Sequence, residues 1–221
     1  MSGGLDSSVS AILCKRVLGD EVLGLTMPCH SDPSDEEHAR LVADLFDIRT
    51  EKVDLGPVFD LFLSLLPDAG RVPVANLKPR LRMIVLYYFS NRLDYLVVGS
   101  GNKSELMTGY FTKYGDGAAD ILPLGGLLKT EVRRLAQELG VPVEIMAKPP
   151  SAGLWAGQTD EGELGISYDG LDRALCALES DQTNQPDDEV LARVREMESR
   201  SHHKRTSIPI YEPFEGAQNT L

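Results

Sequence analysis

Two adjacent glycines and two hydroxyl side chains stand near the start of the chain, in the stretch SGGLDS at residues 2–7. Glycine lets a backbone approach a phosphate closely and adopt positive φ. The N–H groups that open a following helix then attract anions, as does the helix dipole. Asp6 adds a carboxylate that can hold Mg²⁺ against the same phosphates. The stretch therefore predicts a loop that binds a pyrophosphate group. It lacks the Gly-Lys-Ser/Thr ending of the common nucleoside-triphosphatase loop, and a plain turn with a helix N-cap is the alternative.

A second stretch suited to a nucleotide is GSGNKSE at residues 99–105, which follows an apolar run and precedes a helical pattern. The Ser100 hydroxyl can bond an adenine or a ribose, and Glu105 can supply a second carboxylate to Mg²⁺. The alternative is a solvated helix cap with Glu105 as an i,i+4 partner, and taken alone this alternative is the better interpretation.

The stretch GYFTKYGDG at residues 109–117 combines three aromatic residues, one lysine and three glycines, and Asp120 follows it. Aromatic rings can stack on a base while Lys113 contacts a phosphate or a carboxylate. A loop that packs on its own side chains is the alternative. Because packing alone hardly explains this composition, we favour a substrate loop.

Two basic stretches could contact an anionic ligand. NLKPRLR at residues 76–82 places Lys78 and Arg80 at the start of a helical pattern. A role in binding phosphate and a solvated helix end are equally good interpretations of this stretch. HHKR at residues 202–205 contains adjacent histidines, which diverge on a strand or a helix and so make a poor chelating pair. We interpret this second stretch as a basic tail segment that returns to an anionic ligand.

Prolines and glycines shape a further loop at residues 149–155, PPSAGLW, which contains the only tryptophan of the chain. The stretch QTDEGELG at residues 158–165 follows it. A lid and a simple ordered loop are both compatible with this pattern.

The composition is that of a globular protein, with 42% hydrophobic and 25% charged residues. The net charge of −12 argues against a non-specific nucleic-acid surface. Three widely spaced cysteines suit neither a disulfide framework nor a zinc site, and indicate a reducing compartment. No apolar run approaches membrane-spanning length and no signal peptide is visible, so we expect a cytoplasmic protein without a membrane partner.

The apolar spacing predicts helices over residues 7–18, 35–46, 58–66, 77–93, 103–107, 129–139 and 187–197, and buried strands over residues 21–27, 49–53 and 95–99. An extended basic segment is expected after the last helix, and a loop at residues 109–119. Strands that alternate with helices predict an α/β fold with a three-layer parallel sheet and helices on both faces. Ligands bind such sheets beyond the carboxyl ends of the strands.

With 221 residues, the chain is expected to form one domain. A phosphate loop of this kind normally follows a buried strand, but only Met1 precedes Ser2, so we expect the first strand of the sheet to be missing. Such a loss would leave neighbouring strands unpaired. The apolar run at residues 83–89 exceeds one helical face, which predicts burial against a partner subunit as well as against the sheet.

Taken together, these stretches resemble the ammonia-dependent NAD synthetases, and the SGGLDS loop resembles the SGGxDS signature of the ATP pyrophosphatases. The resemblance runs from Ser2 to about Pro209 and includes, in order, SGGLDSS, NLKPRLRM, YFTKYGDG, LLKTEVR, KPPSAGLW, DEGELGISYD and HHKR. It implies a fold like the adenine-nucleotide α-hydrolases (Rossmann-like), a homodimer, and Mg²⁺ with ATP as co-substrate. It also implies a ligase of NAD biosynthesis that forms a C–N bond. ATP adenylates deamido-NAD with release of pyrophosphate, and ammonia then displaces AMP to give NAD⁺.

The resemblance also implies roles for individual residues. The ATP-binding residues would be Ser2, Gly3, Gly4, Leu5, Asp6, Ser7, Ser100, Lys129 and Ser151, with Asp6 and Glu105 as Mg²⁺ ligands. The deamido-NAD-binding residues would be Arg80, Lys113, Asp120, His203 and Lys204. Asp120 and Lys129 would be the catalytic residues; that Asp120 orients ammonium or takes a proton is our own hypothesis.

Two other classes of protein remain as alternatives. The first is another ATP-pyrophosphatase amidotransferase or a tRNA-thiolating enzyme, although a thiolating enzyme would want cysteines at the nucleotide and a basic surface. The second is an inactive or truncated nucleotide-binding homologue. No glutaminase domain is present in the sequence, so free ammonia or a separate amide donor is the expected nitrogen source.

Overall fold

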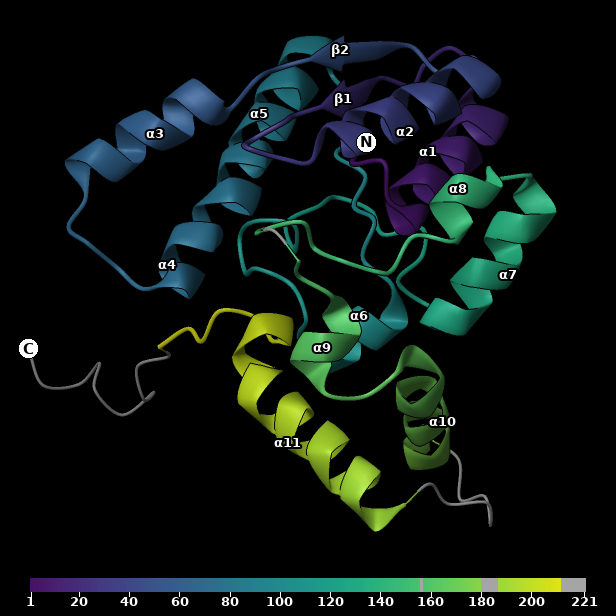
Figure 1. Ribbon diagram of the computed structural model, residues 1–221, viewed down its shortest axis with the longest axis vertical. Coiled ribbons are helices and arrows are strands. Elements are labelled where there is room, and N and C mark those ends of the chain that lie inside the picture. Colours follow the sequence, from purple (N-terminus) through teal and green to yellow (C-terminus); the bar gives the residue numbers. More distant parts are fainter. Residues whose placement is uncertain (156, 180–186, 212–221) are drawn as a thin grey trace, which may run out of the picture.

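The computed structural model describes residues 1–155, 157–179 and 187–211. Its helices and strands follow in the order α1 (Leu5–Leu18), β1 (Gly24–Thr26), α2 (Pro33–Leu45), β2 (Thr50–Lys52), α3 (Gly56–Leu65), α4 (Arg71–Ala75), α5 (Leu77–Leu93), α6 (Lys103–Thr108), α7 (Lys129–Leu139), α8 (Val143–Met146), α9 (Asp160–Leu164), α10 (Tyr168–Glu179) and α11 (Asp188–Arg205). In Figure 1, the strand pair crosses the top of the molecule near α1, α2 and α5, whereas α10 and α11 lie at the opposite end.

The two strands pair in parallel, with Leu25 opposite Glu51. The parallel sheet and the α/β class predicted from the sequence are therefore confirmed, although both strands are shorter than predicted. The first residue runs beside β1, because the amine of Met1 donates a hydrogen bond to the carbonyl of Leu25 at 2.5 Å. The SGGLDS loop thus begins beside the sheet.

The third predicted strand, at residues 95–99, is reduced to one parallel bridge between Val98 and Ile121. The cause is local, because the carboxylate of Asp120 accepts the N–H of Val97 at 2.7 Å. A side chain thereby takes a backbone donor that a regular ladder would pair with a strand carbonyl.

The predicted helices form, and the last one is longer than predicted. Helix α11 continues through the HHKR stretch to Arg205, so the extended basic segment expected there is wrong. Contacts at its final turn explain the extension: Lys204 donates to the carbonyls of Gly109 and Phe111, both at 2.7 Å. Helices α4, α8, α9 and α10 were not predicted from the sequence.

Among the residues that the structure describes, the core consists of three clusters of buried side chains. The largest joins α1, α2 and α7 through residues such as Val9, Val42 and Val132. A second is built on α10 and α11, and a third packs α3 and α5 against the residues that follow the two strands. Within the described residues, none of the helices combines the length and apolarity that a membrane crossing requires.

Gly109 offers a test of how tightly α11 is packed. Its φ is +68°, and a Cβ built there would lie 2.0 Å from the Cβ of Ser201. Gly140 has a φ of +80° but open space around the same position, so it is a matched control. We expect Gly140→Ala to destabilise the protein by about 1–2 kcal/mol, the cost of a left-handed alanine. Gly109→Ala should cost clearly more, because the α11 backbone must also move.

Urea denaturation followed by circular dichroism measures both free energies of unfolding. Equal losses in the two variants would show that α11 does not press on this loop.

Candidate active site

The glycine loop is held by its own hydroxyl groups. Ser2 and Ser7 bond through their hydroxyls at 2.9 Å, and the hydroxyl of Ser7 also donates to the carbonyl of Gly4 at 3.1 Å. Gly3 has a φ of +72°, and a Cβ at that position would lie 2.1 Å from the carbonyl oxygen of Asp35 in α2. A glycine is therefore required, because the start of α2 passes directly against the loop.

Lys129 brings two predicted metal ligands together. Its ammonium group forms an ion pair with Asp6 and a second one with Glu105, at 3.4 Å. The lysine side chain is only 3% exposed. Each of the three residues lies in the first turn of a helix: Asp6 in α1, Glu105 in α6 and Lys129 in α7. The fold therefore brings the N-terminal turns of three helices together around one buried cation.

Asn102 fixes the two carboxylates relative to each other. Its amide nitrogen donates to Asp6 at 3.1 Å, and its oxygen accepts the N–H of Glu105 at 3.0 Å. The carboxylate of Glu105 accepts the Asn102 N–H in return, at 3.2 Å, which completes a capping box. Asn102 is fully buried, so this amide is a fixed part of the site.

Burial and the charges within this cluster shift the pKa values of Glu105 and Lys129. Burial and the nearby Asp6 carboxylate raise the pKa of Glu105, and Lys129 offsets only part of that effect. Burial alone would lower the pKa of Lys129, but the carboxylates of Asp6 and Glu105 outweigh it and raise the pKa. Two carboxylates thus share one ammonium group, and the site can accept further positive charge.

The carboxylates fit Mg²⁺ by their chemistry. Mg²⁺ prefers oxygen ligands and is commonly held by one or two carboxylates together with substrate phosphates. Asp6 and Glu105 supply two such groups beside the glycine loop. Within the described residues, no group of three or more acidic, histidine or cysteine side chains forms a complete metal site. Two carboxylates beside a loop suited to pyrophosphate fit a metal that is shared with a phosphorylated ligand.

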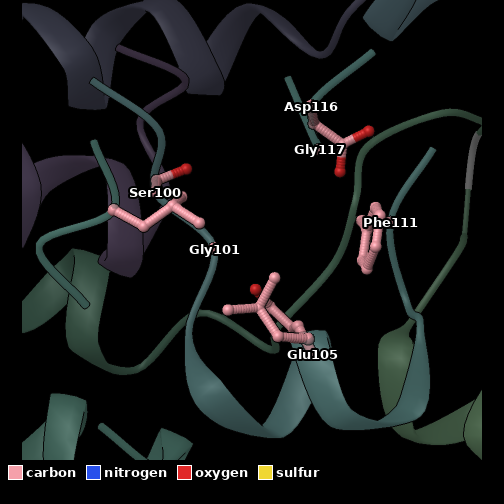
Figure 2. Close-up of a pocket in the computed structure, with 8 residues that line it drawn as sticks. Ser100, Gly101, Glu105, Phe111, Asp116 and Gly117 are labelled. Carbon is pink, nitrogen blue, oxygen red and sulfur yellow. The ribbon is translucent and has the colours of Figure 1, made fainter. Parts of the chain in front are cut away.

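A pocket opens next to this cluster (Figure 2), lined by Ser100, Gly101, Glu105, Leu106, Phe111, Asp116, Gly117 and Leu122. The carboxylate of Asp116 and the ring of Phe111 lie on one side of the pocket, and Ser100 lies on the other. The pocket thus joins the second predicted nucleotide stretch to the aromatic loop.

Four of the predicted dinucleotide-binding residues form one connected group. Arg80 donates to the carbonyl of Lys113 at 3.4 Å, and the ammonium group of Lys113 donates to the carbonyl of His203 at 2.5 Å. Lys204 follows in the chain, and its ammonium group lies 5.2 Å from the centre of the Phe111 ring. The cations of α5, the aromatic loop and α11 are therefore adjacent.

Two other predicted residues lie apart from these contacts. Asp120 accepts bonds from the Val97 N–H and, at 3.3 Å, from the Tyr87 hydroxyl. The hydroxyl of the exposed Ser151 accepts the N–H of Gly153 at 3.1 Å. Neither residue lines the pocket in Figure 2, and their roles remain predictions.

Two residues of the site, Asn102 and Asp116, were not predicted from the sequence. Asn102 and Asp116 lie inside stretches that were recognised, but no individual role was predicted for them. The Asn-x-x-Glu spacing of a capping box was the available signal for Asn102. The aspartate between two glycines was a weak signal for Asp116.

The fold and the site together define an α/β protein of the adenine-nucleotide α-hydrolase kind, with a glycine loop, paired carboxylates and a buried lysine at one end of a parallel sheet. The family model described as NAD synthase matches residues 1–208. The chain therefore belongs to the NAD synthase family, as its motifs predicted.

Individual proteins resemble the chain over most of its length. An NH(3)-dependent NAD(+) synthetase of Carboxydothermus hydrogenoformans is 45% identical, and the match covers 93% of this chain and 84% of that protein. A structure titled NMN synthetase from Francisella tularensis is 37% identical with a TM-score of 0.88, covering 96% of this chain and 87% of that chain. The NH3-dependent NAD synthetase of Campylobacter jejuni is 30% identical with a TM-score of 0.82, and the coverages are again 96% and 87%.

The raised pKa of Glu105 predicts a pH-dependent stability. A carboxyl group whose pKa is higher in the folded state than in the unfolded state binds more protons when folded. The free energy of unfolding should therefore fall as the pH rises from 4.5, the ordinary pKa, towards the raised value. Each unit of pKa shift is worth about 1.4 kcal/mol. Glu105→Gln should flatten this part of the stability profile.

Urea titrations at several pH values without divalent metal measure the effect, with Glu37→Gln, an exposed carboxylate of α2, as the control. A Glu105→Gln profile parallel to that of the control would contradict the assignment.

Proposed function

We propose that the chain catalyses the ATP-dependent amidation of deamido-NAD by ammonia, which gives NAD⁺, AMP and pyrophosphate. Membership of the NAD synthase family and the names of the relatives support this reaction. The observation that carries it in this chain is the buried ion-pair cluster of Lys129 with Asp6 and Glu105, beside a glycine loop that suits a pyrophosphate group.

The first step joins two anions, so it needs positive charge at the reacting phosphorus. A carboxylate oxygen of deamido-NAD attacks the α-phosphorus of ATP. The bond from this phosphorus to the oxygen that bridges the α- and β-phosphates breaks, and pyrophosphate leaves. Mg²⁺, when bound, neutralises charge on the transferring phosphate and on the leaving group. Asp6 and Glu105 would hold this metal, and Lys129 would reach the phosphates. The remaining ATP contacts would come from Ser2, Gly3, Gly4, Leu5, Ser7, Ser100 and Ser151.

The second step forms the amide. Ammonia attacks the carbonyl carbon of the acyl adenylate, AMP leaves, and a proton is lost from nitrogen. Water must be excluded, since it would hydrolyse the same intermediate. The connected group of Arg80, Lys113, His203 and Lys204 would bind the dinucleotide and help to exclude water from the acyl adenylate. Asp120 is the candidate to orient ammonium or take the proton.

Nicotinic acid mononucleotide is a second candidate for the acid substrate. The structure from Francisella tularensis that resembles this chain with a TM-score of 0.88 is titled NMN synthetase. The chemistry would be identical, because the reacting carboxylate is attached to the nicotinic acid ring in both molecules. The two acids are therefore compared in the same assay.

We also propose a homodimer, because α3 and α5 both expose apolar side chains, which we together call the apolar face. Leu61 and Leu65 of α3 are 58% and 73% exposed, and Ile84 and Tyr88 of α5 are 56% and 62% exposed. Exposed apolar patches of this kind mark interfaces. Helix α5 contains the apolar run at residues 83–89, from which a partner subunit was predicted, and a second copy of the chain would cover the apolar face. The substrates favour a cytoplasmic location.

The reaction is tested by incubating the protein with ATP, Mg²⁺, ammonium and either acid, and measuring AMP, pyrophosphate and the amide product. We expect AMP and pyrophosphate in equal amounts, dependent on the acid. Asp6→Asn should lower adenylation at least about a hundredfold, because a metal-binding carboxylate is lost. Asp20→Asn is the matched control, since that carboxylate is 93% exposed and pairs only with Lys15 among the contacts described.

ADP as product, or ATP cleavage without either acid, would contradict the proposed reaction. Faster amidation of nicotinic acid mononucleotide would assign the chain to the second candidate.

The dimer is tested by placing charges on the apolar face. Leu61→Glu and Leu65→Glu should shift the mass measured by light scattering from two chains to one, because a carboxylate is costly to bury. Val143→Glu on α8 is the control, since Val143 is 74% exposed but lies outside this face. A wild-type protein that already has the mass of one chain would exclude the dimer.

A further inference from the structure

Two buried side chains of helix α10, Tyr168 and Asp172, lie next to the candidate site. Tyr168 is 0% exposed and Asp172 is 3% exposed, and they lie one helical turn apart on the same face. Helix α10 packs against both α6 and α7, the helices that carry Glu105 and Lys129. Neither residue has a role in the reaction proposed above.

The carboxylate of Asp172 joins the starts of two helices. One oxygen accepts the hydroxyl of Ser104 at 2.5 Å, and the other accepts the N–H of Thr130 at 2.8 Å. The Ser104 oxygen accepts the backbone N–H of Lys129 at 2.9 Å. One carboxylate therefore holds Ser104, which adjoins Glu105, and the first two residues of α7.

This contact also completes the first turn of α7. The residue before the helix is Leu128, whose side chain cannot accept the free N–H groups that every helix start leaves. Asp172 and Ser104 supply acceptors from other helices, and the negative charge suits the positive end of the helix dipole. The position of the Lys129 backbone is thus set by α10.

Tyr168 supports the other end of the same lysine. The Lys129 ammonium group lies 5.1 Å from the centre of the Tyr168 ring, within the range of a cation–π contact. The Tyr168 hydroxyl donates to the buried Asp160 at 3.0 Å, which fixes the ring against α9. The ring therefore limits the directions in which the ammonium group can move away from Asp6 and Glu105.

Packing alone does not explain this pair. A buried carboxylate is costly even when it is hydrogen-bonded, and a neutral acceptor could satisfy the same two donors without burying a charge. The two carboxylate oxygens of Asp172 accept hydrogen bonds from Ser104 and Thr130, which are the neighbours of Glu105 and Lys129 in the chain. Small displacements of such groups lower reaction rates strongly.

We propose that Asp172 and Tyr168 are positioning residues that hold Lys129 between Asp6 and Glu105, Asp172 through the backbone and Tyr168 through the ammonium group. The inference deepens the proposed function and rests on it. Neither side chain touches a substrate, and each acts through Lys129.

The first test compares Asp172→Asn with Asp169→Asn. The asparagine keeps one acceptor oxygen but removes the charge and replaces the other oxygen with an amide NH₂ donor, whereas Asp169 is an exposed carboxylate on the same helix. In Asp172→Asn, we expect the KM for ATP to rise and the adenylation rate to fall, each about tenfold. The KM for ammonium should stay unchanged. Pyrophosphate exchange into ATP in the presence of the acid measures adenylation alone.

The second test compares Tyr168→Phe with Tyr168→Leu and decides the matter where Asp172→Asn does not fold by circular dichroism. Phenylalanine keeps the ring under the ammonium group and loses only the bond to Asp160, so it should recover most of the adenylation rate that leucine loses. A purely structural role would make both variants lose activity in proportion to folded protein, with the KM for ATP unchanged.

Titration calorimetry with ATP and Mg²⁺ gives a readout that does not depend on turnover. Weaker ATP binding in Asp172→Asn and Tyr168→Leu than in Asp169→Asn supports the inference even where the wild type forms no amide, an outcome that would refute the proposed function alone. ATP affinity and KM within twofold of the control, in folded variants, would overturn the inference.

Discussion

One buried ammonium group organises the candidate site. Lys129 lies between Asp6 and Glu105, which come from segments far apart in the sequence. The positive ends of three helices meet at this point, and the two carboxylates balance part of their charge. Because the site holds one cation for two carboxylates, it is electrostatically prepared for a metal ion and for the phosphates that would accompany it.

The aromatic loop at residues 109–117 is the second part that must be held in place. Its lysine reaches the end of α11, and Lys204 in return binds two carbonyls of the loop. Side chains predicted to bind a ligand thus bond to the backbone in this structure. They would have to exchange these bonds for contacts with a substrate.

Much of the site could be predicted because its residues lie in short motifs. The glycine loop and Lys113 of the aromatic loop were recognised from local composition, and the metal-binding role of Glu105 was favoured once the motifs were taken together. The structure brings many of the predicted residues together. The α/β class followed from alternating apolar runs. The third strand was overpredicted, since YLVVG has an apolar composition suited to a strand, but the Asp120 side chain takes a donor of its ladder.

What the sequence could not provide is contact between distant elements. The role of Asp172 depends on the approach of α10 to the start of α7, and no local pattern signals that approach. The helical state of the HHKR stretch depends on carbonyls more than ninety residues earlier in the chain. Local propensity is weak where tertiary hydrogen bonds decide the conformation.

The close approach of Gly109 to Ser201 of α11 has a consequence for synthesis on the ribosome. The aromatic loop leaves the exit tunnel long before α11 has been translated, so it lacks its supporting helix for that interval. The buried cluster around α1, α2 and α7 contains no residue of α11, whereas the aromatic loop lacks its packing partner until the final helix is made. A nascent chain at that stage would already contain Asp6, Glu105 and Lys129, but not the helix against which residues 109–117 pack.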